Sequence, residues 1–177
     1  LKSGKKIEGF IKYSNRYKIQ NNIEFYTDKD DKKSKTKYNA DDLTEYMMAD
    51  KKYEVIHYSG GLMSKPVRGN LVIKEGCIME YEWYDKIDGA ELAPQLDNES
   101  DKDYFNRIYP PKTVYKKYDA EEVRDIQYFG LKFAKKMSEF VSDNKEISTK
   151  VANKEKGFKM LNILDIIEQY NAACTKK

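Results

Sequence analysis

The only histidine of the chain is His57, and histidine is the residue type that most often acts as a general base in enzymes. A serine or cysteine nucleophile needs such a base beside it, and the base needs a third group to orient it. His57 stands at the end of an expected strand, and the chain contains no G-x-S-x-G pattern. We therefore interpret His57 as a structural or surface residue and assign no catalytic residue.

Two glutamates, Glu80 and Glu82, stand two residues apart in another expected strand and therefore share one face. Paired carboxylates of this kind catalyse glycoside hydrolysis when one is a proton donor and the other a base or nucleophile. Glutamates on one half-exposed strand face are more often solvated or paired with lysine across the sheet. A hydrolase that uses Asp and Glu therefore stays the alternative function rather than the first one.

The two cysteines, Cys77 and Cys174, fit no C-x-x-C pattern and no zinc-ligand spacing. One histidine and two distant cysteines do not make a zinc site. Two thiols that are buried or unpaired are the simpler interpretation. The alternative is a disulfide between the C-terminal tail and the strand region, which the spacing alone does not establish.

Neither a metal site nor a cofactor site is predicted. The acidic residues Asp97, Glu99, Asp101 and Asp103 lack the central glycine and the terminal glutamate of a calcium-binding EF-hand loop. Ser59-Gly60-Gly61 indicates a turn, because it lacks the spacing of a phosphate-binding glycine loop.

Aromatic side chains are the most unusual feature of the composition, since the chain has 15 tyrosines. A tyrosine has an apolar ring and a polar tip, which suits both half-buried strands and binding surfaces. Aromatic rings on a strand can stack on bases or sugars, although cross-strand packing is their commoner use. The candidate binding residues are Tyr81, Trp83, Tyr84, Tyr104 and Tyr109.

The chain has 177 residues, which corresponds to about one domain. Charged residues make up 36% of the sequence, yet the net charge is only +3 because basic and acidic residues are interleaved. A nucleic-acid-binding protein usually has a strong basic excess on one face, so we expect no nucleic-acid partner. No apolar stretch approaches the length that spans a bilayer, so we expect no membrane-spanning segment.

Strand patterns dominate residues 1–84, helical patterns dominate 119–174, and an irregular, acidic insertion over 85–118 lies between them. Strands of one region followed by helices of another are typical of an α+β fold, not of a doubly wound parallel sheet. We predict a single α+β domain over 1–177, with an antiparallel, barrel-like N-terminal sheet and a C-terminal helical segment. The expected strands are Ile7–Tyr13, Ile23–Tyr26, Thr44–Ala49, Tyr53–Tyr58, Val67–Lys74 and Cys77–Tyr84.

Helical periodicity after Asp119 predicts one long amphipathic helix that Asp119 caps. A short helix to Val151 follows, and Gly157 separates it from the last helix. The apolar face expected for that last helix consists of Met160, Leu161, Ile163, Leu164, Ile167 and Tyr170.

Five segments at the two ends of the chain form a recognisable pattern: Ile7–Tyr13, Ile23–Tyr26, Tyr38–Leu43, Met137–Asp143 and Asn162–Asn171. These segments, together with the central hairpin expected over 67–84, resemble uncharacterised secreted proteins of Bacteroidetes bacteria, in which a signal peptide precedes a similar pair of strands. The resemblance implies export to the periplasm or the cell surface and a trimmed N-terminus, with the cytoplasm as the alternative location. In such a compartment a Cys77–Cys174 bond is chemically permitted.

These observations together predict a non-enzymatic exported module that binds a protein, a glycan or an envelope component. The tyrosine-rich strands and the acidic insertion supply candidate binding surfaces. The hydrolase named above is the alternative.

Overall fold

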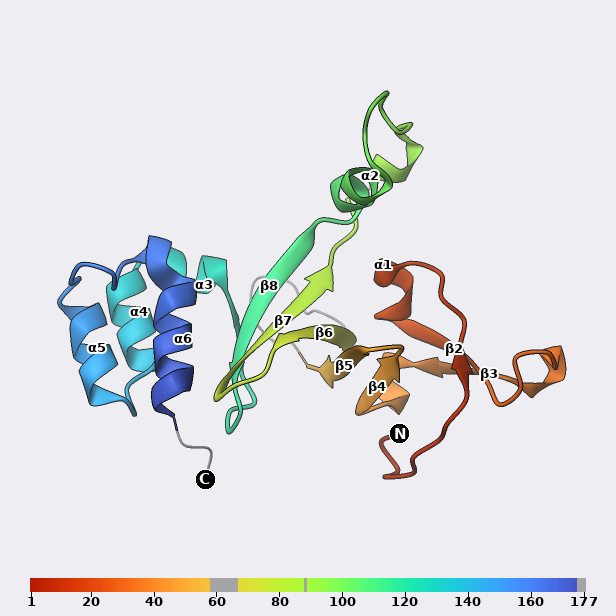
Figure 1. Ribbon diagram of the computed structural model, residues 1–177, viewed down its shortest axis with the longest axis horizontal. Helices are drawn as coiled ribbons and strands as arrows, with labels where there is room; N and C mark the ends of the chain where they lie inside the picture. Colours follow the sequence, from red (N-terminus) through yellow and green to blue (C-terminus); the bar gives the residue numbers. More distant parts are fainter. Residues whose placement is uncertain (58–66, 88, 175–177) are drawn as a thin grey trace. The chain divides into compact units, whose positions relative to one another are not determined.

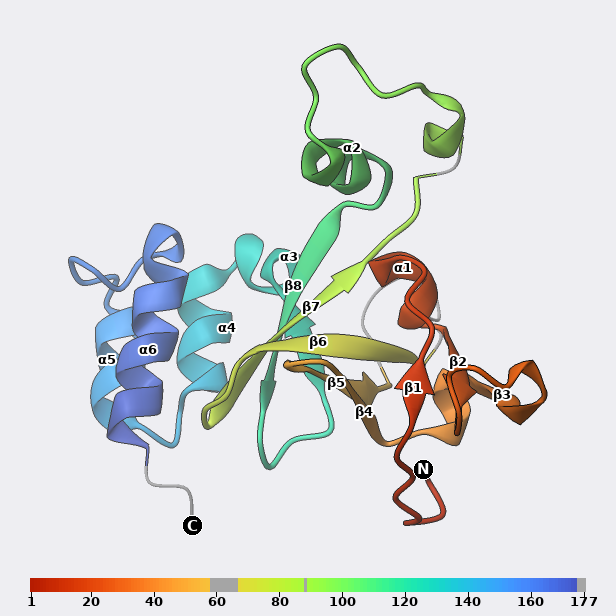
Figure 2. The ribbon, with the colours of Figure 1, turned by 45° about the vertical axis from the view of Figure 1, so that its right-hand side comes forward.

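The computed structural model describes residues 1–57, 67–87 and 89–174, and these form a mixed α+β structure with two antiparallel sheets (Figure 1, Figure 2). This architecture confirms the predicted fold class, and the strands form open sheets rather than a barrel. The packing divides the chain into two units. Unit 1 comprises Leu1–Val72 and Tyr81–Lys112, and unit 2 comprises Ile73–Glu80 and Thr113–Lys177. The prediction of one domain over 1–177 stays a prediction.

The first sheet belongs to unit 1 and has the order β1-β2-β3. Its strands are β1 (Phe10–Ile11), β2 (Asn22–Tyr26) and β3 (Lys35–Asn39). Ile23 and Phe25 of β2 are buried on one face, as their alternation predicts. A Cβ atom on Gly9 would lie 2.4 Å from the carbonyl oxygen of Tyr26, so only glycine allows this close approach.

The second sheet has the order β4-β5-β6-β7-β8-β9, and β6, β7 and β8 contribute residues to both units. The predicted neighbours Val67–Lys74 and Cys77–Tyr84 correspond to β6 and β7. The predicted turn Ser59-Gly60-Gly61 lies outside the described residues. The bounds are β4 (Glu45–Met48), β5 (Lys51–Ile56), β6 (Arg68–Lys74), β7 (Ile78–Tyr84), β8 (Pro111–Lys117) and β9 (Val123–Asp125).

A hydrophobic cluster of unit 1 joins the first sheet to β4, β5 and β6. Tyr46 and Tyr53 are cross-strand partners in β4 and β5, and their rings stack with centroids 4.8 Å apart. The short helix α1 (Arg16–Ile19) adds Ile19 to this cluster. The buried members are Ile19, Ile23, Phe25, Leu43, Tyr46, Tyr53 and Leu71.

Regular structure replaces much of the irregular insertion that was predicted over 85–118. Helix α2 (Asp101–Ile108) begins after Ser100, whose hydroxyl accepts a hydrogen bond from the Asp103 N–H. Strand β8 begins at Pro111. Proline has no backbone N–H to donate, and the first residue of a strand is a position that tolerates this loss. The glycine and proline residues of this segment favour a loop, but Ser100 is a residue type that caps helices and indicates the start of α2.

The helical part of unit 2 differs from prediction at its start. The residues after Asp119 form β9 before α3 (Ile126–Gly130), and Asp125 rather than Asp119 caps the first helix. Leu131 and Lys132 then interrupt the predicted long helix before α4 (Phe133–Phe140). Helix α5 spans Lys145–Ala152, and α6 spans Ile163–Ala173.

The buried face of α6 consists of Ile163, Ile166, Ile167 and Tyr170, which follow the i, i+3, i+4, i+7 pattern of a helix. Part of the apolar face predicted there is wrong, because residues 160–162 form a 3₁₀ turn and do not extend the helical stripe. The exposed residues that the prediction had placed inside are Met160, Leu161 and Leu164.

Cys77 and Cys174 form a disulfide within unit 2, with their Cα atoms 6.3 Å apart. The simpler interpretation of two free thiols is therefore wrong. The bond links Cys77, directly before β7, to Cys174, directly after α6, across a sequence separation of 97. Across the described residues, no helix is long and apolar enough to cross a membrane.

Candidate functional site

Strand β7 carries three of the five predicted binding residues, and all three are buried. Tyr81, Trp83 and Tyr84 expose only 1%, 4% and 2% of their surface. Their rings are therefore not exposed as a platform for a ligand, and they position other groups instead.

Tyr81 is held by a polar chain from β5. Its hydroxyl donates to Glu54 Oε2 at 2.6 Å, and Lys52 Nζ donates to Glu54 Oε1 at 2.8 Å. A buried tyrosine usually needs such a partner, because an unpaired hydroxyl in the interior is destabilising. Tyr81 is thus a structural residue of the sheet.

Trp83 lies between two cations of unit 1. The Arg68 guanidinium carbon is 4.7 Å from the centre of the indole ring, and Lys112 Nζ is 5.2 Å from it. Lys112 also pairs with Asp85 at 2.8 Å. Burial is the largest single influence and opposes ionisation of Asp85, but the hydrogen bond and charge of Lys112, the Lys86 N–H and the charge of Arg68 together lower the pKa of Asp85.

The Arg68 side chain is incompletely paired. Its Nε and Nη1 atoms are buried and make no hydrogen bond to any residue in the described ranges. Its attraction to the Trp83 ring compensates for only part of the lost solvation.

Tyr84 of β7 is hydrogen-bonded both to β7 itself and to residues of α1 and its C-terminal end. Its hydroxyl accepts a hydrogen bond from Arg16 Nη1 at 2.7 Å and donates one to Glu82. The buried Gln20 amide bonds to both backbone groups of Tyr84, at 2.9 Å from its N–H and 2.5 Å from its carbonyl. Burial and the hydrogen bond to Glu82 raise the pKa of Tyr84, so the phenol stays neutral.

An aromatic cluster continues from Tyr84 to the surface. The Tyr84 ring meets Phe105 of α2 edge-on at 5.5 Å, and Phe105 meets Tyr109 at 5.0 Å. Tyr109 then stacks on Tyr17 of α1, with centroids 4.9 Å apart and planes 15° apart. Tyr17, Phe105 and Tyr109 are only partly buried. The structure thus brings the predicted residues Tyr84 and Tyr109 into one cluster.

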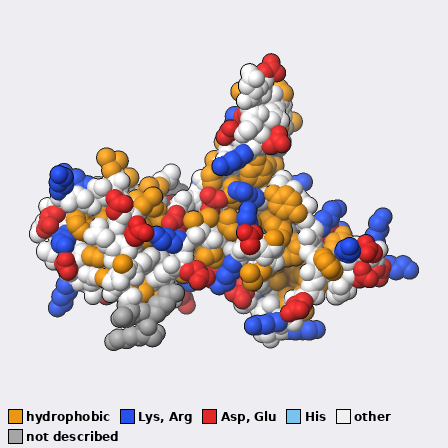
Figure 3. Space-filling view, viewed as in Figure 1, with side chains coloured by type: hydrophobic (Ala, Val, Ile, Leu, Met, Phe, Trp, Pro, Cys, Tyr) orange, Lys and Arg blue, Asp and Glu red, His pale blue; other side chains and the backbone are white. Residues whose placement is uncertain are grey.

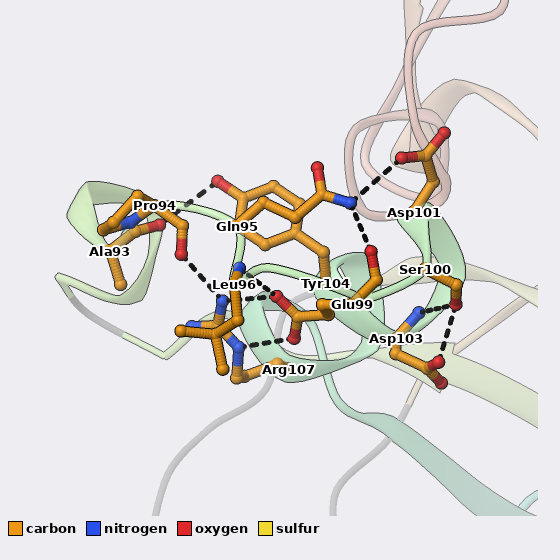
Figure 4. A network of polar contacts seen from close by, with 10 residues as sticks. All are labelled: Ala93, Pro94, Gln95, Leu96, Glu99, Ser100, Asp101, Asp103, Tyr104 and Arg107. Atoms are coloured by element: carbon orange, nitrogen blue, oxygen red, sulfur yellow. Dashed lines mark hydrogen bonds and ion pairs between the residues drawn. The ribbon is translucent and has the colours of Figure 1, made fainter.

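Tyr104 takes part in a separate network that closes the loop before α2 (Figure 4). Its hydroxyl donates to the Ala93 carbonyl at 3.3 Å, and the Arg107 guanidinium lies over its ring. Arg107 makes two 2.8 Å bonds to the Glu99 carboxylate. This pairing and the Leu96 N–H lower the pKa of Glu99 to about 2. The acidic residues therefore stabilise the loop, and no metal-binding group of side chains is found among the described residues.

A cavity of about 500 Å³ opens beside Tyr17 in unit 1. Asn15 caps α1 by accepting the Lys18 N–H, and the Asn21 side chain donates to the Tyr17 carbonyl. These bonds fix the helix that carries Tyr17. The remaining lining is polar and consists of Lys12, Ser14, Lys18, Asn21, Asn22 and Glu24.

The sequence analysis did not predict this cavity, because α1 has only four residues and is too short to show the helical spacing of apolar residues. The signal that was present is Asn15, a residue type that favours helix N-caps. The stacking of Tyr17 on Tyr109, 92 positions later, has no signature in the sequence.

His57 is exposed at the end of β5, and Glu82 is held by the Tyr84 hydroxyl. Neither is brought next to a serine or cysteine nucleophile by any contact seen in the described residues.

Comparisons of the chain with protein-family profiles, with curated proteins and with solved structures found no match.

Proposed function

We propose that this protein is a non-enzymatic module that binds a glycan at the cavity beside Tyr17. The observation that carries the proposal is the Tyr17–Tyr109 stack at the edge of a polar cavity. An aromatic ring covers the apolar face of a sugar, while amide and hydroxyl groups bond to the sugar hydroxyls. Ser14, Asn21 and Asn22 supply such groups here.

Preorganisation of the cavity supports the proposal. The Tyr17 ring is held by Tyr109, and the backbone of α1 is held by Asn15 and Asn21. A rigid site loses little conformational entropy on binding. The buried residues Tyr84 and Gln20 then serve as the support that couples β7 to α1.

A glycan array followed by calorimetric titration of the hits tests this function. We expect Tyr17→Ala to weaken the best glycan by at least about tenfold, which corresponds to about 1.4 kcal/mol. Tyr118→Ala is the matched control, because Tyr118 is 45% exposed and belongs to unit 2. Equal affinity of both variants, or no glycan hit for the native chain, would rule out the proposed site.

The pKa directions of five carboxylates lend the alternative hydrolase no support. A general acid at a glycosidase site has a raised pKa. Five described carboxylates have instead a lowered pKa. A turnover screen on glycans and peptides would revive the alternative if it gave hydrolysis that Glu82→Gln abolishes. The five carboxylates are Glu24, Asp85, Glu99, Asp143 and Glu146.

Export is part of the proposal. The Cys77–Cys174 disulfide supports it, because such bonds persist in oxidising compartments and are rare in the cytosol. The resemblance of both chain ends to secreted Bacteroidetes proteins points the same way. Thiol labelling of the protein in its native cells distinguishes the two locations, since a cytosolic protein would have both thiols free.

We also propose that nucleic acid is not the ligand. Acidic and basic side chains are interspersed on the face that Figure 3 shows. A binding curve with single-stranded nucleic acid that weakens steeply with salt would contradict this part of the proposal.

A further inference from the structure

A second surface feature lies in unit 2, apart from the glycan cavity. A groove of about 580 Å³ runs between the start of α4 and the loop that follows α5, and we name it the lysine-rimmed groove. Phe133 and Phe158 are nearly buried, at 9% and 8% exposure, and form its floor. Leu131 and Met160 line it as well and are 99% and 40% exposed. The groove therefore presents two apolar side chains, Leu131 and Met160, that the described part of the chain does not cover.

Four exposed lysines form the rim of this groove, and none of its nine lining residues is acidic. Lys135 has a distant partner, Glu139, at 3.9 Å, and an exposed pair of this kind contributes little. Lys132, Lys154 and Lys159 form no ion pair with any residue in the part of the chain that the structure describes. The rim thus carries positive charge that is not neutralised locally.

Backbone hydrogen bonds hold both walls in place. On one side, the Lys136 N–H donates to the Lys132 carbonyl at 2.9 Å and begins α4. On the other, Lys154 takes a left-handed conformation with φ of 57°, and its N–H donates to Val151 at 3.0 Å. The Phe158 N–H donates to Glu155 at 2.9 Å, so the loop is fixed up to the floor of the groove. A groove with fixed walls needs little ordering when a partner binds.

We infer that the lysine-rimmed groove binds an acidic amphipathic helix of a protein partner. Apolar side chains of that helix would contact Phe133, Phe158 and Leu131, and its carboxylates would pair with the rim lysines. Helix-in-groove recognition combines these two features, an apolar floor and complementary charge at the edges. A concave floor suits inserted side chains better than a flat lipid surface. The inference is independent of the glycan site, which belongs to unit 1.

Selection from a random peptide library against the full chain tests this inference. We expect the enriched peptides to combine Leu, Phe or Trp at helical spacing with Asp or Glu. Leu131→Ser should weaken the best peptide by about tenfold, because it removes an apolar contact without disturbing the interior. Leu92→Ser is the matched control, since Leu92 is 84% exposed and lies in unit 1.

A charge-reversed chain with Lys132→Glu, Lys154→Glu and Lys159→Glu supplies the second arm. It should lose the acidic peptides and select basic ones, whereas Lys156→Glu, outside the groove, should keep them. The inference fails if no acidic amphipathic peptide is enriched, or if Leu131→Ser and Leu92→Ser bind equally well. Leu131-dependent sedimentation with phosphatidylglycerol vesicles, without peptide enrichment, would overturn it in favour of a lipid surface.

Discussion

The side-chain amide of Asn171 in α6 makes two hydrogen bonds to the backbone of Ile78 at the start of β7. Asn171 Oδ1 accepts the Ile78 N–H at 2.7 Å, and Asn171 Nδ2 donates to the Ile78 carbonyl at 2.9 Å. The Cys77–Cys174 disulfide crosses between the same two elements. A polar pair and a covalent bond therefore hold α6 against this end of the sheet within unit 2.

Gly76 allows this arrangement, and its replacement by alanine should destabilise unit 2. A Cβ atom at Gly76 would lie 2.3 Å from Asn171 Nδ2, so the amide would have to leave Ile78. We expect Gly76→Ala to lower the free energy of unfolding by about 1–3 kcal/mol in urea denaturation. Gly130→Ala is the control, because no atom of the residues that the structure describes lies within 4 Å of a Cβ there. A similar loss in both variants would contradict the proposed steric cause.

Reduction of the disulfide should lower stability by about 2–4 kcal/mol, because the bond restricts a long loop of the unfolded chain. Urea denaturation with and without a thiol reductant measures this effect. A double variant, Cys77→Ala with Cys174→Ala, should have the stability of the reduced protein and no response to the reductant. If reduction leaves the free energy of unfolding of the native chain unchanged, the bond contributes no stability.

Acidification should loosen the loop before α2 through Glu99. The two bonds from Arg107 lower the pKa of Glu99 from 4.5 to about 2. A lowered folded-state pKa means that the stabilisation is present above the unfolded pKa and is lost as the pH falls through the folded one. We expect the protection factors of the amides of residues 96–107, which correct for the intrinsic pH dependence of exchange, to be high at pH 5 and to fall as the pH approaches 2.

Glu99→Gln provides the control for this titration. At pH 5 the amides of residues 96–107 should already exchange faster in the variant than in the native chain. Lowering the pH should then cause no further loss of protection that depends on residue 99. A carboxyl resonance of Glu99 that titrates near pH 4.5 in the native chain would show that the Arg107 pairing does not hold in solution.

Replacement of Arg68 by methionine should leave stability unchanged or raise it by up to about 1 kcal/mol. Methionine keeps an apolar stem against Trp83 and removes two buried nitrogens that lack hydrogen-bond partners among the described residues. Arg16→Met is the comparison, because Arg16 bonds to the Tyr84 hydroxyl and its loss should destabilise by about 1 kcal/mol. A larger loss for Arg68→Met than for Arg16→Met would show that Arg68 has a partner in solution.

Much of the fold could be predicted because local patterns carry it. The alternation in β2 places Ile23 and Phe25 inside, and the spacing in α6 places Ile163, Ile167 and Tyr170 inside. The predictions that failed depended on short signals. Asp119 and Asp125 are equally good helix caps by type, and only the pairing of β8 with β9 shows that the helix begins after the second.

The candidate site could be predicted only in part. Residue type alone selected the partly buried Tyr109 as well as the buried Tyr81, Trp83 and Tyr84, because residue type does not distinguish a binding platform from a core residue. Tyr17 was not selected, since its role comes from stacking on a ring 92 positions away.

The composition determined the balanced charge, and periods of two and 3.6 residues determined the α+β class and part of the buried faces of the longer elements. The tertiary structure decided which residues meet across long separations. Cys77 with Cys174, Asn171 with Ile78, and Tyr17 with Tyr109 are such pairs. Their partners are chosen by the packing of the chain in three dimensions, and local spacing contains no record of that choice.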